Sequence, residues 1–414
     1  MPGMEKDERD DGEGELSLGE RIAWHRRRRG LSREVLAGLV GCSADWLGRV
    51  ERGVLTLDRL SVISALTEEL HLPTGELLPR PAPPARAAGS PRLRRALSDY
   101  RPPAGPPPAP EQLAALVAAA RAAFQSGAYA RAERLTAELL PTARRAAEEQ
   151  EGAGSGRRAP ASEEPEGGGQ RLLALAYQGA AMLLTRVGEA ELAWLAADRG
   201  LTAARASGDL AVVGSLYRSL AHCQLTAGEP AAAREIVVTA VDALRGTRAA
   251  RTADGLSAHG SLLLVGAVAA GRLEDRDGVG EFLAEGERLA ARLGRDANHL
   301  WTAFGPTNLT VHRVSATMEL GDARLAARLG DHLDTSALPP ERRLRLALET
   351  ARAHDARRHR DRALALLLAA EHEAPELVRH HVIARRLVTS WLRRQRGRPD
   401  AHLAYLAARL GLPG

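Results

Sequence analysis

The residues best placed to do chemistry lie in one short stretch, residues 31–53, which reads LSREVLAGLVGCSADWLGRVERG. Gly41 follows Ala37 by four residues, and Ser32 and Ser43 each stand where a hydroxyl could cap a helix. Glycine can adopt the positive φ of a tight turn, and a small residue lets two helices cross closely. The spacing predicts a helix-turn-helix, so double-stranded DNA is the first partner to consider.

Neighbouring helices must hold this motif in place. Leu18 and Ile22 are expected to face inward from a preceding helix, with Trp24 as a further candidate. The arginines 26–29 at the end of that helix complement its dipole and can reach phosphates. A helix over residues 57–71 and a short turn holding Leu77 and Leu78 follow the motif. The apolar contacts between its two helices would come from Leu36, Cys42, Leu47 and Val50.

Residues 16–78 resemble the Cro/repressor-like DNA-binding domain of the XRE family of bacterial regulators, including the Val-Glu-Arg-Gly close of the recognition helix at residues 50–53. The resemblance implies five short helices, with the third inserted into the major groove. By position, the resemblance implies that Ser43 and Trp46 contact phosphates and that Ala44, Asp45 and Arg49 contact base edges. The implied DNA-binding set also includes Arg52 and Arg33, the latter where the family often has glutamine.

Several of these positions have a second interpretation. Asp45 can accept a hydrogen bond from a cytosine amino group but otherwise repels the groove, so Arg49 is the main candidate for reading guanine. Trp46 could instead pack in the core. Glu51 is expected to pair with an arginine or cap nearby amides, and Cys42 to be an apolar core residue. A plain helical hairpin is the alternative to the whole motif.

Composition favours an all-α protein with more than one domain. The chain has 414 residues, of which 44% are hydrophobic but only 3% aromatic, so its cores must use small and aliphatic side chains on helices. The net charge of +5 and the pI near 9.7 agree with a polyanionic partner. Two cysteines far apart fit a reducing cytoplasm. The apolar run 262–270 is too short to span a bilayer, so a cytoplasmic protein, nucleoid-associated when bound to DNA, is expected.

Shifts in composition mark the expected domain boundaries. Residues 1–15 are acidic and are expected to form a disordered tail before the DNA-binding domain, residues 16–78. Residues 79–110 are proline-rich and predict a stiff linker with one short amphipathic piece. The remaining domain covers residues 111–414, in which the Gly- and Glu-rich segment 148–169 is expected to be a disordered insertion.

A repeat runs through this second domain. Helical segments end in a glycine, and a second helix starts soon after; the glycines are Gly127, Gly188, Gly228, Gly271 and Gly321. From Gly188 onward the spacing is about 40 to 50 residues, and a sixth unit without the glycine spans residues 346–373. The pattern resembles degenerate tetratricopeptide (TPR) repeats, which implies an α-solenoid with a concave inner surface. An irregular helical bundle is the alternative.

One segment, WTAFGPTNLTVH at residues 301–312, departs from this pattern. A Gly-Pro break precedes a new helix, for which Thr307 is the expected N-cap, and two polar residues one turn apart could face the groove. A similar FGPTN segment recurs in actinobacterial regulators that join an XRE head to a TPR-like body, which the chain resembles. The effector-binding candidates are Trp301, Phe304, Asn308 and His312. Alternatively, the segment only starts a helix.

Catalytic signatures find little support in the sequence. The histidines near the C-terminus lack the spacing and flanking glutamate of a zinc protease. Asp275, Asp277 and Gly278 mimic part of a calcium loop, but Leu273 and Ala284 occupy its end positions. We therefore expect no enzyme, no catalytic residue, no metal and no cofactor.

Together these features predict a sequence-specific transcription regulator. It would bind DNA as a homodimer, with the repeat domain providing the dimer contact and a site for a peptide or small-molecule effector. The alternative is an interaction scaffold whose repeats recruit another protein while the helix-turn-helix anchors the complex to DNA.

Overall fold

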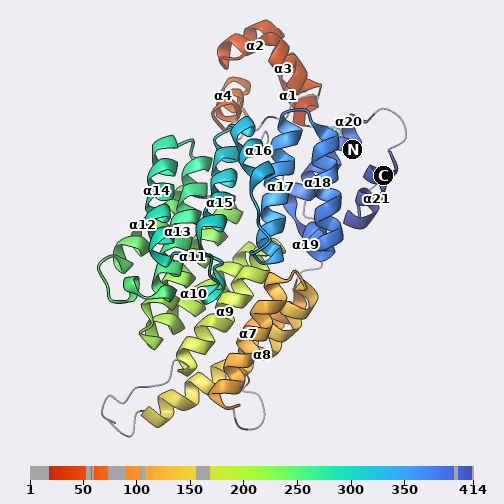
Figure 1. Ribbon diagram of the computed structural model, residues 1–414. Coiled ribbons are helices and arrows are strands. Elements are labelled where there is room, and N and C mark those ends of the chain that lie inside the picture. The colour runs from red at the N-terminus through yellow and green to blue at the C-terminus, as the bar shows by residue number, and fades with distance from the viewer. Residues whose placement is uncertain are drawn as a thin grey trace, which may run out of the picture. The chain divides into compact units, whose positions relative to one another are not determined.

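The computed structural model describes residues 18–52, 57, 60–72, 90–99, 101, 106, 108–154, 168–395 and 400–412 (Figure 1). Several predictions lie outside these residues: the acidic tail 1–15, the turn with Leu77 and Leu78, and most of the proline-rich linker. The chain divides into two compact units, residues 1–86 and residues 87–414. All regular structure in the described residues is helical, which confirms the all-α fold class.

The first unit contains the predicted helix-turn-helix. Its helices are α1 (Leu18–Arg28), α2 (Arg33–Leu39), α3 (Ala44–Glu51) and α4 (Leu60–Leu70). Gly41 takes a φ of 70° in the turn between α2 and α3, as the sequence predicts. Ser32 and Ser43 accept hydrogen bonds from Val35 N and Trp46 N, both at 3.2 Å, so each serine is a helix cap.

A small aliphatic core holds these four helices together. Its fully or nearly fully buried members include Ile22, Leu36, Leu47, Val50 and Leu66. Three of the four predicted inter-helix residues are in this core, and the fourth, Cys42, packs against it partly buried. Burial raises the pKa of the Cys42 thiol, which keeps it protonated and consistent with a packing role.

The second unit opens with α6 (Pro91–Ser98), which packs on α8 through the buried Leu93 and Leu97. Six helical pairs follow: α7 (Pro110–Gln125) and α8 (Tyr129–Gly154), α9 (Gly169–Arg186) and α10 (Ala190–Ser207), α11 (Leu210–Ala227) and α12 (Pro230–Leu244), α13 (Ala253–Arg272) and α14 (Arg276–Leu293), α15 (Pro306–Glu319) and α16 (Ala323–His332), α17 (Pro340–Ala356) and α18 (Arg360–Glu373). Three helices close the chain: α19 (Pro375–His380), α20 (Val382–Arg394) and α21 (Ala401–Leu410). Because α8 continues to Gly154, the first part of the segment 148–169 is helical.

The pairs stack in chain order, and the first helix of each pair contacts the first helix of the next, from α7 through α17 (Figure 1). These six first helices therefore form one inner layer, as in a solenoid of helical hairpins. The last of them, α17, also contacts the first, α7. The inner layer consequently closes on itself, and side chains on its inner face become buried.

In most pairs a glycine lies in the turn that joins the two helices, and one of the predicted glycines does not. Gly127, Gly188, Gly228 and Gly321 have φ between 81° and 87°. Gly271 instead lies buried inside α13, and the left-handed residue of that turn is Glu274, with φ 59°. A Cβ at Gly271 would lie 3.0 Å from Ala316 O of α15, so this glycine permits close helix packing and not a turn.

One described helix, α13, is long and apolar enough to cross a membrane by length and composition alone. Most of its apolar window, 89%, is buried inside the second unit. Its composition is accounted for by a central position in the helical stack, between α11 and α15.

Candidate nucleic-acid interface

A buried carboxylate, Glu51, fixes the end of α3 to its surroundings. Its Oε1 accepts from Arg26 Nε at 2.6 Å, and its Oε2 accepts from Arg26 Nη2 at 3.0 Å and Arg33 Nε at 2.8 Å. Arg26 also donates from Nη1 to Leu31 O at 2.9 Å. The expectation that Glu51 pairs with an arginine is confirmed, and it pairs with two.

The charge state of Glu51 follows from these contacts. Burial raises the pKa of its carboxyl, but the hydrogen bonds and charges of Arg26 and Arg33 outweigh burial and hold the pKa below its ordinary value. The stabilisation is therefore complete above the ordinary carboxyl pKa and is lost as the pH falls through the lowered value.

The arginines 26–29 do not act as one group. Arg26 is buried by its bonds to Glu51 and is unavailable to phosphates, whereas Arg27, Arg28 and Arg29 are exposed. Arg28 lies over the Trp24 ring at 4.9 Å, and Arg29 donates to Glu69 O. Sequence alone could not single out Arg26, because the choice depends on which arginine meets Glu51 across the fold.

The outer face of α3 carries the residues expected at base edges. Asp45 is exposed, while Ala44, Trp46 and Arg49 are half-buried. Arg49 Nη1 lies 4.0 Å from Asp45 Oδ2, a loose pair one turn apart on the helix. Asp45 thus lies close enough to orient the Arg49 guanidinium without satisfying all of its hydrogen-bond donors. Trp46 packs against the core while remaining partly accessible, so both of its roles stay open.

Arg33 and Arg52 extend this face. Arg33 is 44% exposed in its side chain while its Nε is bonded to Glu51. A Cβ at Gly48 would lie 3.3 Å from Arg52 Nη1 and 3.4 Å from Arg33 Cδ, so the glycine makes room for both side chains over α3. Ser43, at the start of α3, is exposed as well.

The second set of candidates lies in the second unit. Phe304 is fully buried and its ring fills the space over Gly260 of α13, where a Cβ would lie 2.0 Å from the ring's Cζ. Asn308 and His312 are buried on α15, and His312 Nδ1 lies 2.9 Å from Asn308 O. Trp301 is half-buried in η2 (His299–Trp301) and contacts Arg121 of α7, whose guanidinium is 5.4 Å from the ring.

The start of α15 differs from the prediction. Thr307 is not the N-cap, because the helix begins at Pro306 and Gly305 occupies the cap position. Asp296 supplies the missing acceptor: its Oδ1 accepts from Thr307 N at 3.0 Å and its Oδ2 from Thr307 Oγ1 at 2.6 Å. The cap therefore comes from a residue distant in sequence, which the local pattern could not reveal.

Acidic and histidine side chains elsewhere have structural partners. Asp275 caps α14 by accepting from Gly278 N at 2.8 Å, and His381 caps α20. His354 Nε2 lies 3.0 Å from Asp331 Oδ1. In the described part of the chain, no group of three or more potential metal ligands comes together.

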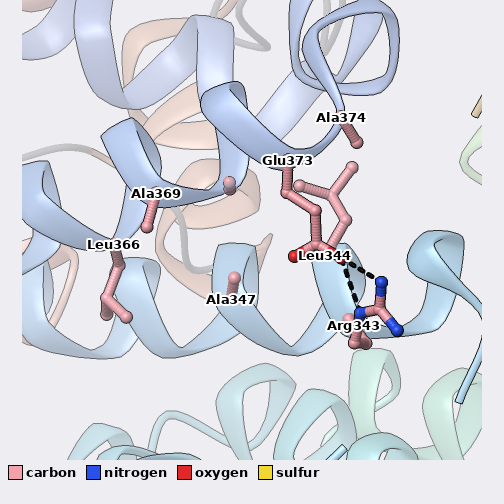
Figure 2. Close-up of a pocket in the computed structure, with 8 residues that line it drawn as sticks. Arg343, Leu344, Ala347, Leu366, Ala369, Glu373 and Ala374 are labelled. Atoms are coloured by element: carbon pink, nitrogen blue, oxygen red, sulfur yellow. Dashed lines mark hydrogen bonds and ion pairs between the residues drawn. The ribbon is translucent and has the colours of Figure 1, made fainter. Parts of the chain in front are cut away.

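Figure 2 shows a shallow pocket between α17 and α18. Its walls are mostly alanine and leucine side chains, and an ion pair between Arg343 and Glu373 lies at one end. None of the predicted site residues lines it, and its two charged groups satisfy each other. It offers no unpaired group with which to recognise a ligand.

A second pocket contains residues that the sequence did not single out. Arg121, Gln178, Arg218 and Arg342 line it together with Trp301. Of its lining residues, the sequence predicted Trp301 as a site residue; a further signal was an arginine in the middle of a largely apolar helix, as Arg218 in α11.

The fold of the first unit and the α3 surface together define a protein with a helix-turn-helix DNA-binding domain. Residues 17–80 match a family model described as a helix-turn-helix domain. Among solved structures, the chain is similar to the crystal structure of Bacillus thuringiensis PlcR in complex with the peptide PapR7 and DNA, at 14% identity and a TM-score of 0.32, over 84% of this chain and 98% of that one. No curated protein sequence matches the chain.

Proposed function

We propose that this chain is a sequence-specific transcription regulator of the XRE family, of the actinobacterial type that carries a TPR-like body, acting in the cytoplasm. One observation supports the proposal above others: the Glu51 ion pairs fix the end of α3, on which the accessible Asp45 and Arg49 lie one turn apart, and hold the partly exposed Arg33 against this helix. Direct readout needs such a helix, since one bidentate arginine–guanine pair discriminates between bases.

The decisive experiment is replacement of Arg49 by alanine. Sites are first selected by genome-wide footprinting, and affinity is then measured by fluorescence anisotropy on the selected duplex and on a scrambled one. We expect a loss of about 1–3 kcal/mol, or about 5- to 150-fold, on the selected duplex and little change on the scrambled one.

The matched control is Arg288→Ala, because Arg288 is an exposed arginine on α14 in the other unit. It removes the same charge and should leave both affinities unchanged. An equal loss on the two duplexes for Arg49→Ala would indicate contacts to phosphate alone, which favours the scaffold that uses DNA only as an anchor.

The proposal includes a homodimer formed through the second unit. Two helix-turn-helix domains about 34–36 Å apart meet successive major-groove faces of a near-palindromic site. Light scattering coupled to size-exclusion chromatography should give twice the chain mass of 44.2 kDa. A mass of one chain at working concentration, with full affinity for the selected duplex, would contradict the dimer.

The second unit, in this proposal, senses an effector. An effector that binds one conformation of the body better would shift the population and so alter DNA affinity. Trp301, Asn308 and His312 are kept as candidate contacts, because the half-buried Trp301 lines the second pocket and the two α15 residues lie on an inner-layer helix. Phe304 contributes by packing.

A further inference from the structure

The inner face of the second unit carries five arginines, which we call the inner arginine cluster: Arg121, Arg186, Arg218, Arg342 and Arg345. They come from α7, α9, α11 and α17, helices of the inner layer that closes where α17 contacts α7. Three of them are at least nine-tenths buried: Arg121 and Arg218 are 5% exposed and Arg342 is 4% exposed. Arginine is seldom buried without a paired anion.

The carboxylates near the cluster are too few to neutralise it. Glu341 accepts from Arg186 and lies 3.1 Å from Arg342, so one acid serves two arginines. Glu349 lies near Arg345, but it also pairs with Arg352 at 3.4 Å. Among the described residues, the five cations are thus matched with two carboxylates, one of them shared with an arginine outside the cluster.

The shortage of carboxylates affects Arg218 most. In the described part of the chain, no hydrogen bond or ion pair to its guanidinium is found, although its side chain is almost fully buried. Burial, followed by the charges of Arg342, Arg121, Arg345 and Arg186, lowers its pKa well below the usual value. Nε of Arg121 and Nε of Arg342 are also buried without a partner. Burying unpaired charge costs free energy, so the arrangement favours an anion.

The histidines and the tyrosine beside the cluster do not supply that anion, and Glu376, a carboxylate near Tyr129, accepts a hydrogen bond from Ala130 N. His222 of α11 and His312 of α15 face the cluster, and burial together with the arginines lowers both pKa values well below 6.5, so both are neutral at pH 7. Burial raises the pKa of the Tyr129 hydroxyl, which therefore stays protonated. The missing negative charge must come from outside the described chain.

The rest of the second pocket indicates what the anion is attached to. Its apolar walls are Phe124, Met182, Leu300 and Trp301, and its neutral polar groups are Gln125 and Gln178. Gln178 accepts from Arg121 and donates to Ser215 O at 2.9 Å. Such a site combines a guanidinium cluster with an aromatic wall, the chemistry that suits an organic anion. Its free volume is about 10 Å³, room for one water-sized group, so the apolar part of such an anion must displace the wall that contains Trp301.

The wall containing Trp301 is held in an unusual conformation. Leu300, Trp301 and Ala303 all have φ between 48° and 53°, a left-handed region that costs free energy for residues other than glycine. Gln125 of α7 holds this segment by donating to Trp301 O at 3.1 Å and by exchanging two hydrogen bonds with Asn298, at 3.0 and 2.8 Å. The strained wall is thus tied directly to the first inner helix.

We propose that the inner arginine cluster binds the carboxylate or phosphate group of a small organic anion whose apolar part packs against Trp301, and that this anion is the effector of the proposed regulator. The inference rests on the proposed function only where it identifies this anion as the effector. Binding itself depends on the charge imbalance, the unpaired Arg218 and the lining of the second pocket.

The test measures thermal unfolding of the full chain with benzoate, phenyl phosphate and the neutral isostere benzamide as probes. We expect at least one anion to raise the unfolding temperature of the second unit by several degrees, while benzamide does not. Benzoate and phenyl phosphate distinguish carboxylate from phosphate recognition. An equal effect of benzamide, or no effect of either anion, would overturn the proposal.

Arg218→Gln is the diagnostic variant, with Arg288→Gln as the matched control on the outer surface. Removing an unpaired buried charge should leave the unliganded protein as stable as the parent or more so, yet weaken anion binding at least about tenfold. A structural arginine would show the opposite, with lower stability and unchanged binding. If Arg218→Gln does not fold, Arg121→Gln decides by the same two measurements.

Measuring DNA affinity on the same samples separates the two proposals. Anion-induced stabilisation without any DNA preference would leave the inner arginine cluster as a binding site and reject the regulator. If the protein distinguishes the selected duplex from the scrambled one but responds to neither anion, only the cluster proposal is rejected.

Discussion

Replacing Glu51 by alanine is expected to unfold the helix-turn-helix domain and abolish DNA binding. The substitution leaves Arg26 buried at 7% exposure with its main partner removed, and it frees Arg33 from α3. Breaking a buried ion pair by removing one partner costs about 3–5 kcal/mol. A domain of this size has a stability of similar magnitude, so the loss should be close to complete.

Limited proteolysis and anisotropy on the selected duplex measure this outcome. Cleavage within the first unit should increase sharply in Glu51→Ala, while the second unit keeps its unfolding temperature. Glu68→Ala is the matched control, since Glu68 lies exposed on α4 and should behave as the parent. Normal protection of the first unit in Glu51→Ala would show that Glu51 does not hold α3.

Replacing Phe304 by alanine is expected to destabilise the second unit by about 3–5 kcal/mol. The ring is fully buried and occupies the space that Gly260 leaves open on α13, so its removal creates a cavity between α13 and the start of α15. The expected loss comes from packing and is independent of any effector.

Calorimetry of the full chain measures the loss as a lower unfolding temperature of the second unit. Trp194→Ala is the control, because that aromatic side chain is 47% exposed on α10 and its removal should change little. Stability of Phe304→Ala equal to the parent would contradict the core role of the Phe304 ring.

Trp301→Ala, by contrast, should weaken anion binding more than it lowers stability.

The sequence predicted features that depend on neighbouring residues. The turn at Gly41 and the caps at Ser32 and Ser43 follow from short spacings and from the preferences of single residue types. For Glu51, the residue type predicted an arginine partner, but which arginines pair with it depends on the fold. The same holds for the hairpin turns, where glycine adopts a positive φ at four of the five predicted positions.

Features that depend on distant segments could not be predicted in this way. Gly271 looked like another turn, but its reason is the close approach of α15. Thr307 looked like a cap, but the acceptor is Asp296 from the preceding connection. The burial of Arg121 and Arg218 requires that the inner layer closes, and no single helix shows this.

The contact between α7 and α17 limits how this architecture can vary in length. In an open stack, an extra hairpin simply lengthens the chain of repeats. Here an inserted hairpin would push apart the two helices that meet, exposing both and admitting water to the interior charges. The number of hairpins is consequently coupled to interior chemistry, and related chains of this architecture should vary in their outer connections before they vary in repeat number.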